Sequence, residues 1–365
     1  MSAAMEDFGI NATQAGLYMS LFFTGYCITQ LPGGVMADKL QPKWILIIST
    51  ILGGICTWLM SVVSTYELGL VVRLIGGLCA GIIMSSCSKV IIANFEPRQR
   101  ATAMGILLAS PPIGILLANQ IAPHLLASVG WRKTFAYMSL FSVLAVVCLI
   151  LFVKPVQNTN NNGAKKGGLL AGLTSFFTDP QQLLLAMSGF MFMFVNNGFS
   201  VWGNKFIQSL GLTGAQGGMI ISAFSVSGII ASCMSGSIAQ KLNISHKKFI
   251  IITLTLMGVF TAIFGMMNSY IALILVGLIY GAFAYLPSTH YTTLASTRAG
   301  DQNGATAISA QNLIFQIASM VQPVIIGQFL DKTENNYTIM WFVFAGVCLL
   351  GVAICLLFKA EKKKA

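Results

Sequence analysis

The chain has 365 residues, of which 56% are hydrophobic and only 8% are charged. Ordinary soluble domains carry about 25% charged residues, so this composition excludes a soluble globular fold and indicates a membrane protein. The formal net charge of +11 does not predict nucleic-acid binding, because the basic residues are scattered through short segments and form no stripe or recognition helix.

Eleven apolar stretches along the chain are long enough to cross a bilayer, at roughly 20 residues each. We expect spans near 15–37, 44–64, 68–93, 102–127, 134–153, 183–207, 216–239, 248–267, 270–295, 304–329 and 338–358. One set of connecting segments, together with the C-terminal tail, holds fifteen Lys and Arg residues, and the other set holds four. Because basic loops stay on the cytoplasmic side, we expect a multi-pass protein of the cytoplasmic (inner) membrane with its C-terminus in the cytoplasm.

An internal repeat relates the two halves of the chain at an offset of 202 residues. Gly16 matches Gly218, and Phe22 matches Phe224. The second copy holds six spans, as in transporters built from parallel repeats. Its first span, 183–207, maps mostly to positions before the first residue of the chain. We therefore expect that the first of twelve spans is missing from the sequence as given.

The expected domains follow from this repeat. An N-terminal bundle with five visible spans occupies 1–153, and a C-terminal six-helix bundle occupies 183–365. Between them, 154–182 includes a polar run of low complexity from Asn158 to Asn162, which is typical of a linker. The orientation of the spans places this linker in the cytoplasm.

Three motifs occur in chain order and carry a family resemblance. They are Gly34-Val35-Met36-Ala37-Asp38-Lys39 followed by Lys43, then Arg73 with Gly77 and Gly81, then Gly130-Trp131-Arg132. They resemble the signature loop, the fourth-helix motif and the entry to the sixth helix of the major facilitator superfamily, although Gln41 stands where the family usually has a glycine. The resemblance covers nearly the whole chain.

The resemblance implies an all-α polytopic fold of two six-helix bundles around a central cavity that opens alternately to the two sides of the membrane. It implies a small-molecule substrate. The spans expected to line the cavity are 68–93, 183–207 and 270–295, together with the missing first span.

The signature loop has a mechanical interpretation. Asp38 can cap or pair with a basic group on a neighbouring helix end, so Gly34, Asp38, Lys39 and Lys43 would form a latch that holds one conformation and breaks in the other. The alternative is an ordinary basic cytoplasmic loop with a turn.

Arg73 is a charge inside the expected span 68–93. An arginine at the centre of a membrane helix costs about 2.5–3.5 kcal/mol on insertion scales, so it should face a cavity or a partner. We interpret it as a contact for an anionic substrate or as part of a proton-linked network. The alternative is an arginine whose head group reaches the nearby outer membrane surface.

Polar residues also gather on the expected span 183–207. Asn197, Ser200 and Asn204 recur at helical spacing, and Lys205 follows near the outer end. Asn196 and Asn197 beside a glycine suggest a locally broken helix, a device that transporters use at binding sites. Substrate contact is the predicted role, and hydrogen bonding between helices is the alternative.

Further candidate substrate contacts lie on three other spans. They are Tyr280 and Tyr285 on 270–295, where Pro287 should bend the helix, Asn312 and Gln316 on 304–329, and Tyr26 and Gln30 on 15–37. None of the ten acidic residues lies in the middle of a span, so a coupling carboxylate would have to lie on the missing helix. Otherwise coupling would use a group such as His290 or the charge of the substrate itself. The eight cysteines form no CxxC pair and lie at no metal-ligand spacing, so we expect no metal site and no cofactor.

We therefore predict a secondary active transporter that takes up a small, anionic organic solute together with a coupling proton or cation, acting as a monomer. An efflux antiporter is the first alternative, although Gly105, Ser110-Pro111-Pro112 and Gly114 match the fifth-helix pattern of drug antiporters only in part. An inactive truncated transporter or a non-transporting sensor is the second. An enzyme is not expected, since the sequence has no HExxH motif, no paired acids and no Ser-His-Asp set.

Overall fold

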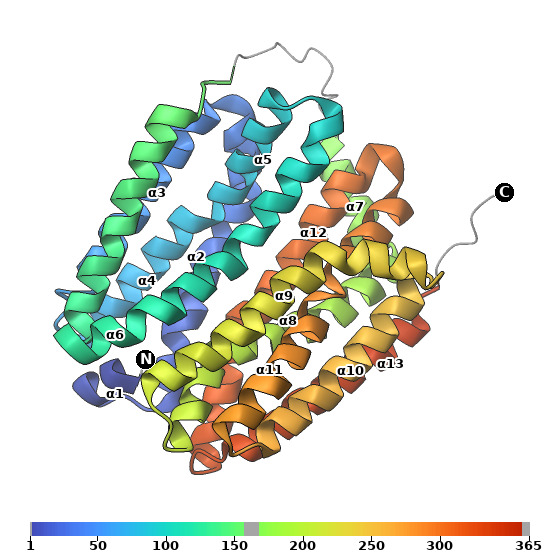
Figure 1. Cartoon of the computed structure of the whole chain (residues 1–365). Coiled ribbons are helices and arrows are strands. Elements are labelled where there is room, and N and C mark those ends of the chain that lie inside the picture. Colours follow the sequence, from blue (N-terminus) through green and yellow to red (C-terminus); the bar gives the residue numbers. More distant parts are fainter. Residues whose placement is uncertain (1, 157–167, 360–365) are drawn as a thin grey trace. The chain divides into compact units, whose positions relative to one another are not determined.

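The computed structural model describes residues 2–156 and 168–359, and the described residues form helices joined by short connections (Figure 1). The helices are α1 (Ser2–Phe8), α2 (Ala12–Lys39), α3 (Pro42–Leu59), α4 (Tyr66–Gly81), α5 (Ile83–Asn94), α6 (Pro97–Phe152), α7 (Gly168–Thr178), α8 (Pro180–Ser209), α9 (Gly214–Lys241), α10 (His246–Met266), α11 (Tyr270–Tyr285), α12 (Ser288–Lys332) and α13 (Tyr337–Leu357). The all-α prediction is confirmed.

The expected spans map onto these helices in order. Nine helical stretches of the described chain are long and apolar enough to cross a membrane, and one of them, Ser110–Phe152 in α6, covers parts of two expected spans. The helix α2 coincides with the expected span 15–37 but is not among the nine. The count is thus consistent with the eleven spans expected.

Two glycines separate spans that are otherwise continuous in α6 and α12. Gly130 has φ 79° and ψ 168°, and Gly300 has φ 73° and ψ 173°. Only glycine adopts this backbone region without strain, because a side chain would clash with the backbone. Each glycine therefore lets the chain turn between two helices without a loop.

Two sequence-based expectations about helix breaks have opposite outcomes. At Pro287, where the sequence predicts a bend, the helix is interrupted, since α11 ends at Tyr285 and α12 begins at Ser288. The predicted break at Asn196-Asn197-Gly198 is wrong, because α8 runs unbroken from Pro180 to Ser209. Gly198 provides room instead: a Cβ at this position would lie 2.4 Å from the ring of Phe344.

The chain divides into two compact units. Unit 1 comprises Met1–Asn161 with Pro323–Asp331, and unit 2 comprises Asn162–Gln322 with Lys332–Ala365. In unit 1, α2 and α4 approach closely, since a Cβ on Gly77 would lie 1.9 Å from the backbone oxygen of Phe22. The helix α3 packs against both α4 and α6.

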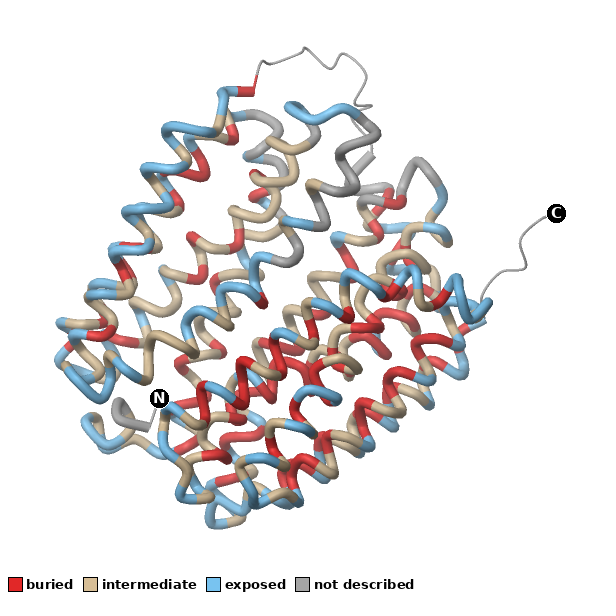
Figure 2. The backbone as a smooth tube through the Cα atoms, viewed as in Figure 1, coloured by how far each residue is buried: buried red, intermediate tan, exposed pale blue. Residues whose placement is uncertain are grey.

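Unit 2 is built around α8. This helix packs against α9 and α13, while α9 packs against α11 and α10 packs against α13. The aromatic rings of Phe199, Phe224, Tyr280 and Trp341 meet in its core. Figure 2 shows the result, with buried residues running along α8 and its neighbours, whereas exposed and half-buried residues predominate on α6 of unit 1.

Candidate functional site

Unit 1 contains a cavity of about 260 Å³ between α2, α3, α4 and α6. Its lining includes Phe22, Ser49, Thr57, Arg73, Phe135 and Ser142. A second, smaller cavity of about 80 Å³ shares Arg73, Met60 and Phe135 with the first. Arg73 therefore lies where the two cavities meet.

The helix α4 presents Arg73 to the cavity through its residue spacing. Arg73, Gly76 and Ala80 lie at i, i+3 and i+7, so they share one face, and all three line the cavity. Gly77 belongs to the neighbouring face that contacts α2. Because a side chain at Gly77 has no room, the contact between α2 and α4 sets the rotation of α4 and hence the direction of Arg73.

The surroundings of Arg73 suit an anion. Its guanidinium carbon lies 5.8 Å from the ring centroid of Phe135, and its Nε is buried with no hydrogen-bond partner among the described residues. A guanidinium group offers five N–H donors in a planar fork that matches carboxylate or phosphate oxygens. The site can therefore neutralise and orient a small anion.

Hydroxyl groups complete the polar part of this cavity. Ser49, Thr50, Thr57 and Ser142 line it, and the Oγ1 of Thr57 donates to the backbone oxygen of Gly53 at 2.9 Å. A hydroxyl that donates in this way still has acceptor lone pairs for the hydroxyl groups of a solute. The lining residues include no Asp or Glu, so Arg73 sets the charge of the cavity.

Sequence reasoning identified Arg73 but missed the rest of the lining. Phe135 and Ser142 lie on the part of α6 that follows Gly130, and neither was among the residues predicted from the sequence. A signal did exist in α3, since Ser49, Gly53 and Thr57 recur every four residues and mark one face of small and polar side chains.

The predicted latch residues lie at the end of α2 and the start of α3. Of Gly34, Asp38 and Lys39 the structure describes only the helical backbone, and their side chains lie outside the described part. Lys43 donates from Nζ to the backbone oxygen of Ile150 at 3.0 Å. Lys43 thus satisfies a carbonyl near the C-terminal end of α6, where a positive charge is favourable.

The polar residues of α8 have different surroundings. Asn196 and Asn197 are buried, Ser200 is exposed, and Asn204 and Lys205 are half-buried. The Nδ2 of Asn196 donates to the backbone oxygen of Ala284 at 2.6 Å. This contact is the interhelical hydrogen bond that the sequence left as an alternative. The Nζ of Lys205 lies 5.5 Å from the Trp202 ring centroid.

The remaining candidates lie on α2, α11 and α12. Tyr280 is completely buried in the aromatic core, where its ring contacts Phe199. Tyr285, Asn312, Gln316, Tyr26 and Gln30 are half-buried. The structure thus brings Tyr280 and Tyr285 to Phe224 within unit 2, whereas Tyr26 and Gln30 belong to unit 1.

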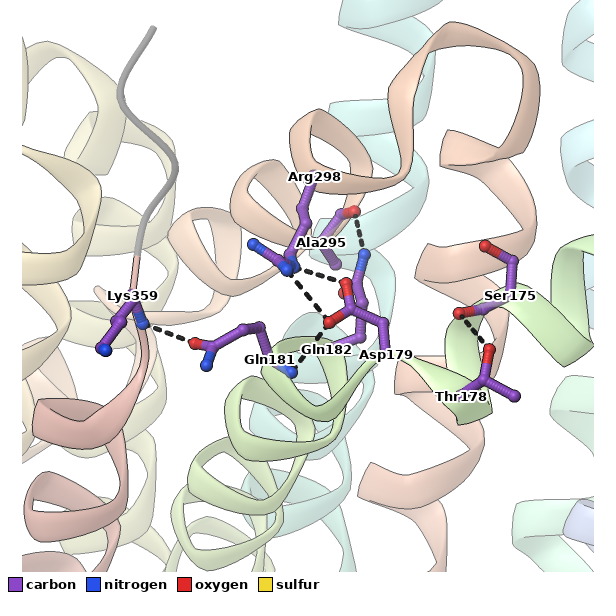
Figure 3. Close-up of polar contacts among 8 residues, drawn as sticks. All are labelled: Ser175, Thr178, Asp179, Gln181, Gln182, Ala295, Arg298 and Lys359. Atoms are coloured by element: carbon purple, nitrogen blue, oxygen red, sulfur yellow. Dashed lines mark hydrogen bonds and ion pairs between the residues drawn. The ribbon is translucent and has the colours of Figure 1, made fainter.

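An ion pair that sequence reasoning missed joins the start of α8 to α12 (Figure 3). Arg298 donates from Nε and Nη2 to the two carboxylate oxygens of Asp179, at 2.5 and 3.0 Å. Asp179 also caps α8 by accepting the backbone N–H of Gln181 at 2.9 Å, and Gln182 donates to the backbone oxygen of Ala295. Burial alone would raise the pKa of Asp179, but its hydrogen bonds to Arg298 and Gln181 outweigh this and lower it.

The helices and the composition define a multi-pass α-helical membrane protein. Comparison with known proteins gives its family: the pattern described as Major Facilitator Superfamily matches residues 1–323 and, in a second match, 208–365. The chain belongs to the major facilitator superfamily and is a membrane transporter.

Individual relatives span nearly the same length. The hexuronate transporter of Bacillus subtilis (strain 168) is 21% identical over 96% of this chain and 85% of its own. The probable sulfoacetate transporter SauU of Cupriavidus necator is 24% identical over 95% and 85%. Among solved structures, the nucleoside transporter NupG has the same fold, with a TM-score of 0.82 and 16% identity over 98% of this chain and 94% of that one. These relatives are transporters, not enzymes.

Proposed function

We propose that this transporter takes up a small organic anion by cation symport and that Arg73 binds the anionic group of the solute. The observation that carries this proposal is the cavity of about 260 Å³ in which Arg73 is the only charged residue among the described lining residues. An unpaired arginine inside a membrane span is expensive, so its position favours a role in which an anion compensates it.

The chemistry of the cavity supports an organic acid with hydroxyl groups. Arg73 supplies a cationic fork, four hydroxyl side chains supply hydrogen bonds, and Phe22 and Phe135 supply apolar surface. The names of two relatives, a hexuronate transporter and a probable sulfoacetate transporter, also describe organic anions. This agreement supports an anionic substrate class and leaves the individual solute open.

We also propose the location, oligomeric state and conformational change that the sequence predicts. The protein lies in the cytoplasmic membrane with a cytoplasmic C-terminus, acts as a monomer, and alternates access between the bundles 1–153 and 183–365. The loop from Gly34 to Lys43 acts as the latch between its conformations. Asn204, Lys205 and Tyr285 remain proposed substrate contacts. So do Tyr26 and Gln30 on α2 and Asn312 and Gln316 on α12.

Thermal unfolding of the purified protein tests the anion site directly. Galacturonate should raise the melting temperature, whereas galactose, which has the same ring without the carboxylate, should not. Arg73→Gln should weaken the response to galacturonate at least about 30-fold, because a buried charge pair contributes roughly 2 kcal/mol or more. Arg73→Lys keeps the charge without the fork and should show an intermediate loss.

Two results would contradict the proposal. A response to galacturonate that survives in Arg73→Gln would show that the anion binds elsewhere. Stabilisation by organic cations but not by organic anions would favour the alternative of an efflux antiporter. Uptake into proteoliposomes then tests direction and coupling, since symport predicts that an inward cation gradient accelerates anion entry.

A further inference from the structure

A cluster of polar atoms lies buried between α8 and α12 in unit 2. Asn197 on α8 faces Ser319 and Gln322 on α12, and the side chains of Ser319 and Gln322 are fully buried. The Oγ of Ser319 and the Nε2 of Gln322 have no hydrogen-bond partner among the described residues. Gln311, on the same face three turns earlier in α12, also has both amide atoms buried and unpartnered.

The backbone of α12 adds a carbonyl oxygen that lacks its helical hydrogen bond at this point. In an α-helix the carbonyl of residue 319 accepts a hydrogen bond from the N–H of residue 323. Residue 323 is Pro323, which has no N–H, so the carbonyl oxygen of Ser319 lacks its helical partner. Inside a membrane such a carbonyl must find a partner elsewhere.

The distances around Asn197 are long for hydrogen bonds. The Asn197 amide nitrogen lies 3.4 Å from the carbonyl oxygen of Ser319 and 3.5 Å from the Oε1 of Gln322. An ordinary N–H···O bond is about 2.9 Å. Since the oxygen and nitrogen of an asparagine amide are interchangeable by a flip, the Oδ1 can occupy this position instead.

With the amide flipped, the spacing is that of oxygens that share a cation. Sodium is about the size of calcium and holds oxygens at about 2.4 Å, so two ligands at right angles lie about 3.4 Å apart. The Oδ1 of Asn197 then lies 3.4 Å from the carbonyl oxygen of Ser319 and 3.5 Å from the Oε1 of Gln322. All of these ligands are neutral, and neutral oxygens suit a monovalent cation better than a divalent one.

We propose that Asn197, Ser319 and Gln322 form a sodium site between α8 and α12. The inference rests on the proposed symport, for which it supplies the coupling ion. The expected spans hold no acidic residue at mid-membrane, so neutral oxygens and a carbonyl freed by proline perform the task that a carboxylate performs elsewhere. Sodium binding then links α8 to α12 and favours one arrangement of these two helices.

Thermal unfolding of the purified full chain in NaCl, KCl and choline chloride at equal ionic strength, without any solute, tests the site. The wild type should melt about 2–5 °C higher in NaCl than in KCl or choline chloride. Asn197→Asp keeps the oxygen ligand and adds a negative charge, so it should melt lower than the wild type in KCl and show at least a twofold larger shift in NaCl.

The neighbouring asparagine offers a matched control. Asn196→Asp removes the donor to Ala284 and should lower the melting temperature equally in all three salts. Ser319→Ala should raise the half-saturating sodium concentration about tenfold. Pro323→Ala restores an N–H for the Ser319 carbonyl, so it should also reduce the response to sodium while melting no lower than the wild type in KCl.

The proposal is overturned if the wild type shows no sodium-specific shift, or if Asn197→Asp behaves like Asn196→Asp. A shift caused by CaCl₂ but not by NaCl would also overturn it. The outcome is separable from the anion site: a sodium shift that persists while galacturonate has no effect would contradict the proposed anion uptake and leave the sodium site standing.

Discussion

The two units share a repeat but fill the corresponding space in different ways. In unit 2 the ring of Phe199 from α8 stacks on Phe224, with centroids 3.9 Å apart, and also contacts Tyr280 and Trp341. In this unit 67% of the most apolar stretch of α8 is buried. A single helix thus fills the centre of unit 2 with aromatic side chains.

In unit 1 the space that corresponds to the aromatic core of unit 2 is a cavity. Gly77 against the Phe22 carbonyl corresponds to Gly281 against the Phe224 carbonyl, and Gly54 against Ser142 corresponds to Gly258 against Cys348. The same alignment of the two halves pairs Phe22 with Phe224, Met60 with Phe264, Gly76 with Tyr280 and Phe135 with Trp341. All four unit 1 residues line the cavity that contains Arg73.

The two units differ in the space that they leave for a charge. The rings around Phe199 fill the centre of unit 2, and its buried polar groups lie elsewhere, such as Asn197 with Ser319 and Ser188 with Tyr291. In unit 1 the corresponding residues include Gly76 in place of a tyrosine and Met60 in place of a phenylalanine, and Arg73 lies among them.

The largest expected effect is the loss of the central ring in unit 2. Phe199→Ala should destabilise the protein by about 3–5 kcal/mol, because it removes a fully buried ring and leaves a cavity. Phe22→Ala in unit 1 should cost only about 1–2 kcal/mol, because this ring already borders empty space. Unfolding of both variants in the same detergent gives the comparison, and equal losses would contradict it.

The close contact of two helices should be equally sensitive in both units. A Cβ would lie 1.9 Å from the Phe22 oxygen at Gly77 and 2.1 Å from the Phe224 oxygen at Gly281. Gly77→Ala and Gly281→Ala should therefore each cost about 1–3 kcal/mol by overpacking. Gly76→Ala is the matched control, since its Cβ would meet no atom closer than 3.6 Å and alanine gains about 0.5–1 kcal/mol in helix propensity. A loss of stability in Gly76→Ala as large as in Gly77→Ala would show that the cavity face of α4 is not open.

The smallest expected effects concern one ion pair in each unit. In unit 2 the side chains of Arg298 and Asp179 are 16% and 27% exposed, whereas in unit 1 those of Arg132 and Asp7 are 38% and 42% exposed. Asp179→Asn should cost about 1–2 kcal/mol because the pair is partly buried and bidentate, and Asp7→Asn no more than about 0.5 kcal/mol.

The ion pair of Asp179 and Arg298 predicts that the stability of the protein depends on pH. Folding lowers the pKa of Asp179, so the contribution of its carboxylate is complete above the unfolded pKa of about 4 and is lost as the pH falls below it. The wild type should therefore lose more stability than Asp179→Asn when the pH falls from 5 to 3. Parallel losses in the two proteins would show that another group dominates in this range.

Much of the fold could be predicted because it depends on local pattern. Long apolar runs predict membrane helices, and Pro287 predicts the interruption between α11 and α12, since proline removes a backbone donor wherever it occurs. The sequence wrongly predicted a break at Asn196-Asn197-Gly198, where α8 is continuous. The role of Gly198 depends on Phe344, which is 146 positions away in the chain.

The class of protein, the order of its helices, its family and the presence of one arginine within a membrane span could all be predicted from the sequence. These follow from composition, from helical periodicity and from motifs that are each contained in a few neighbouring residues. The side chains around that arginine, the hydrogen bond of Asn196 to Ala284, the position of Asn197 beside Ser319 and the place of Tyr280 in an aromatic core became known from the folded structure. The physical reason is that helical spacing assigns a residue to a face, whereas the partner on that face comes from a distant segment and depends on how the helices pack.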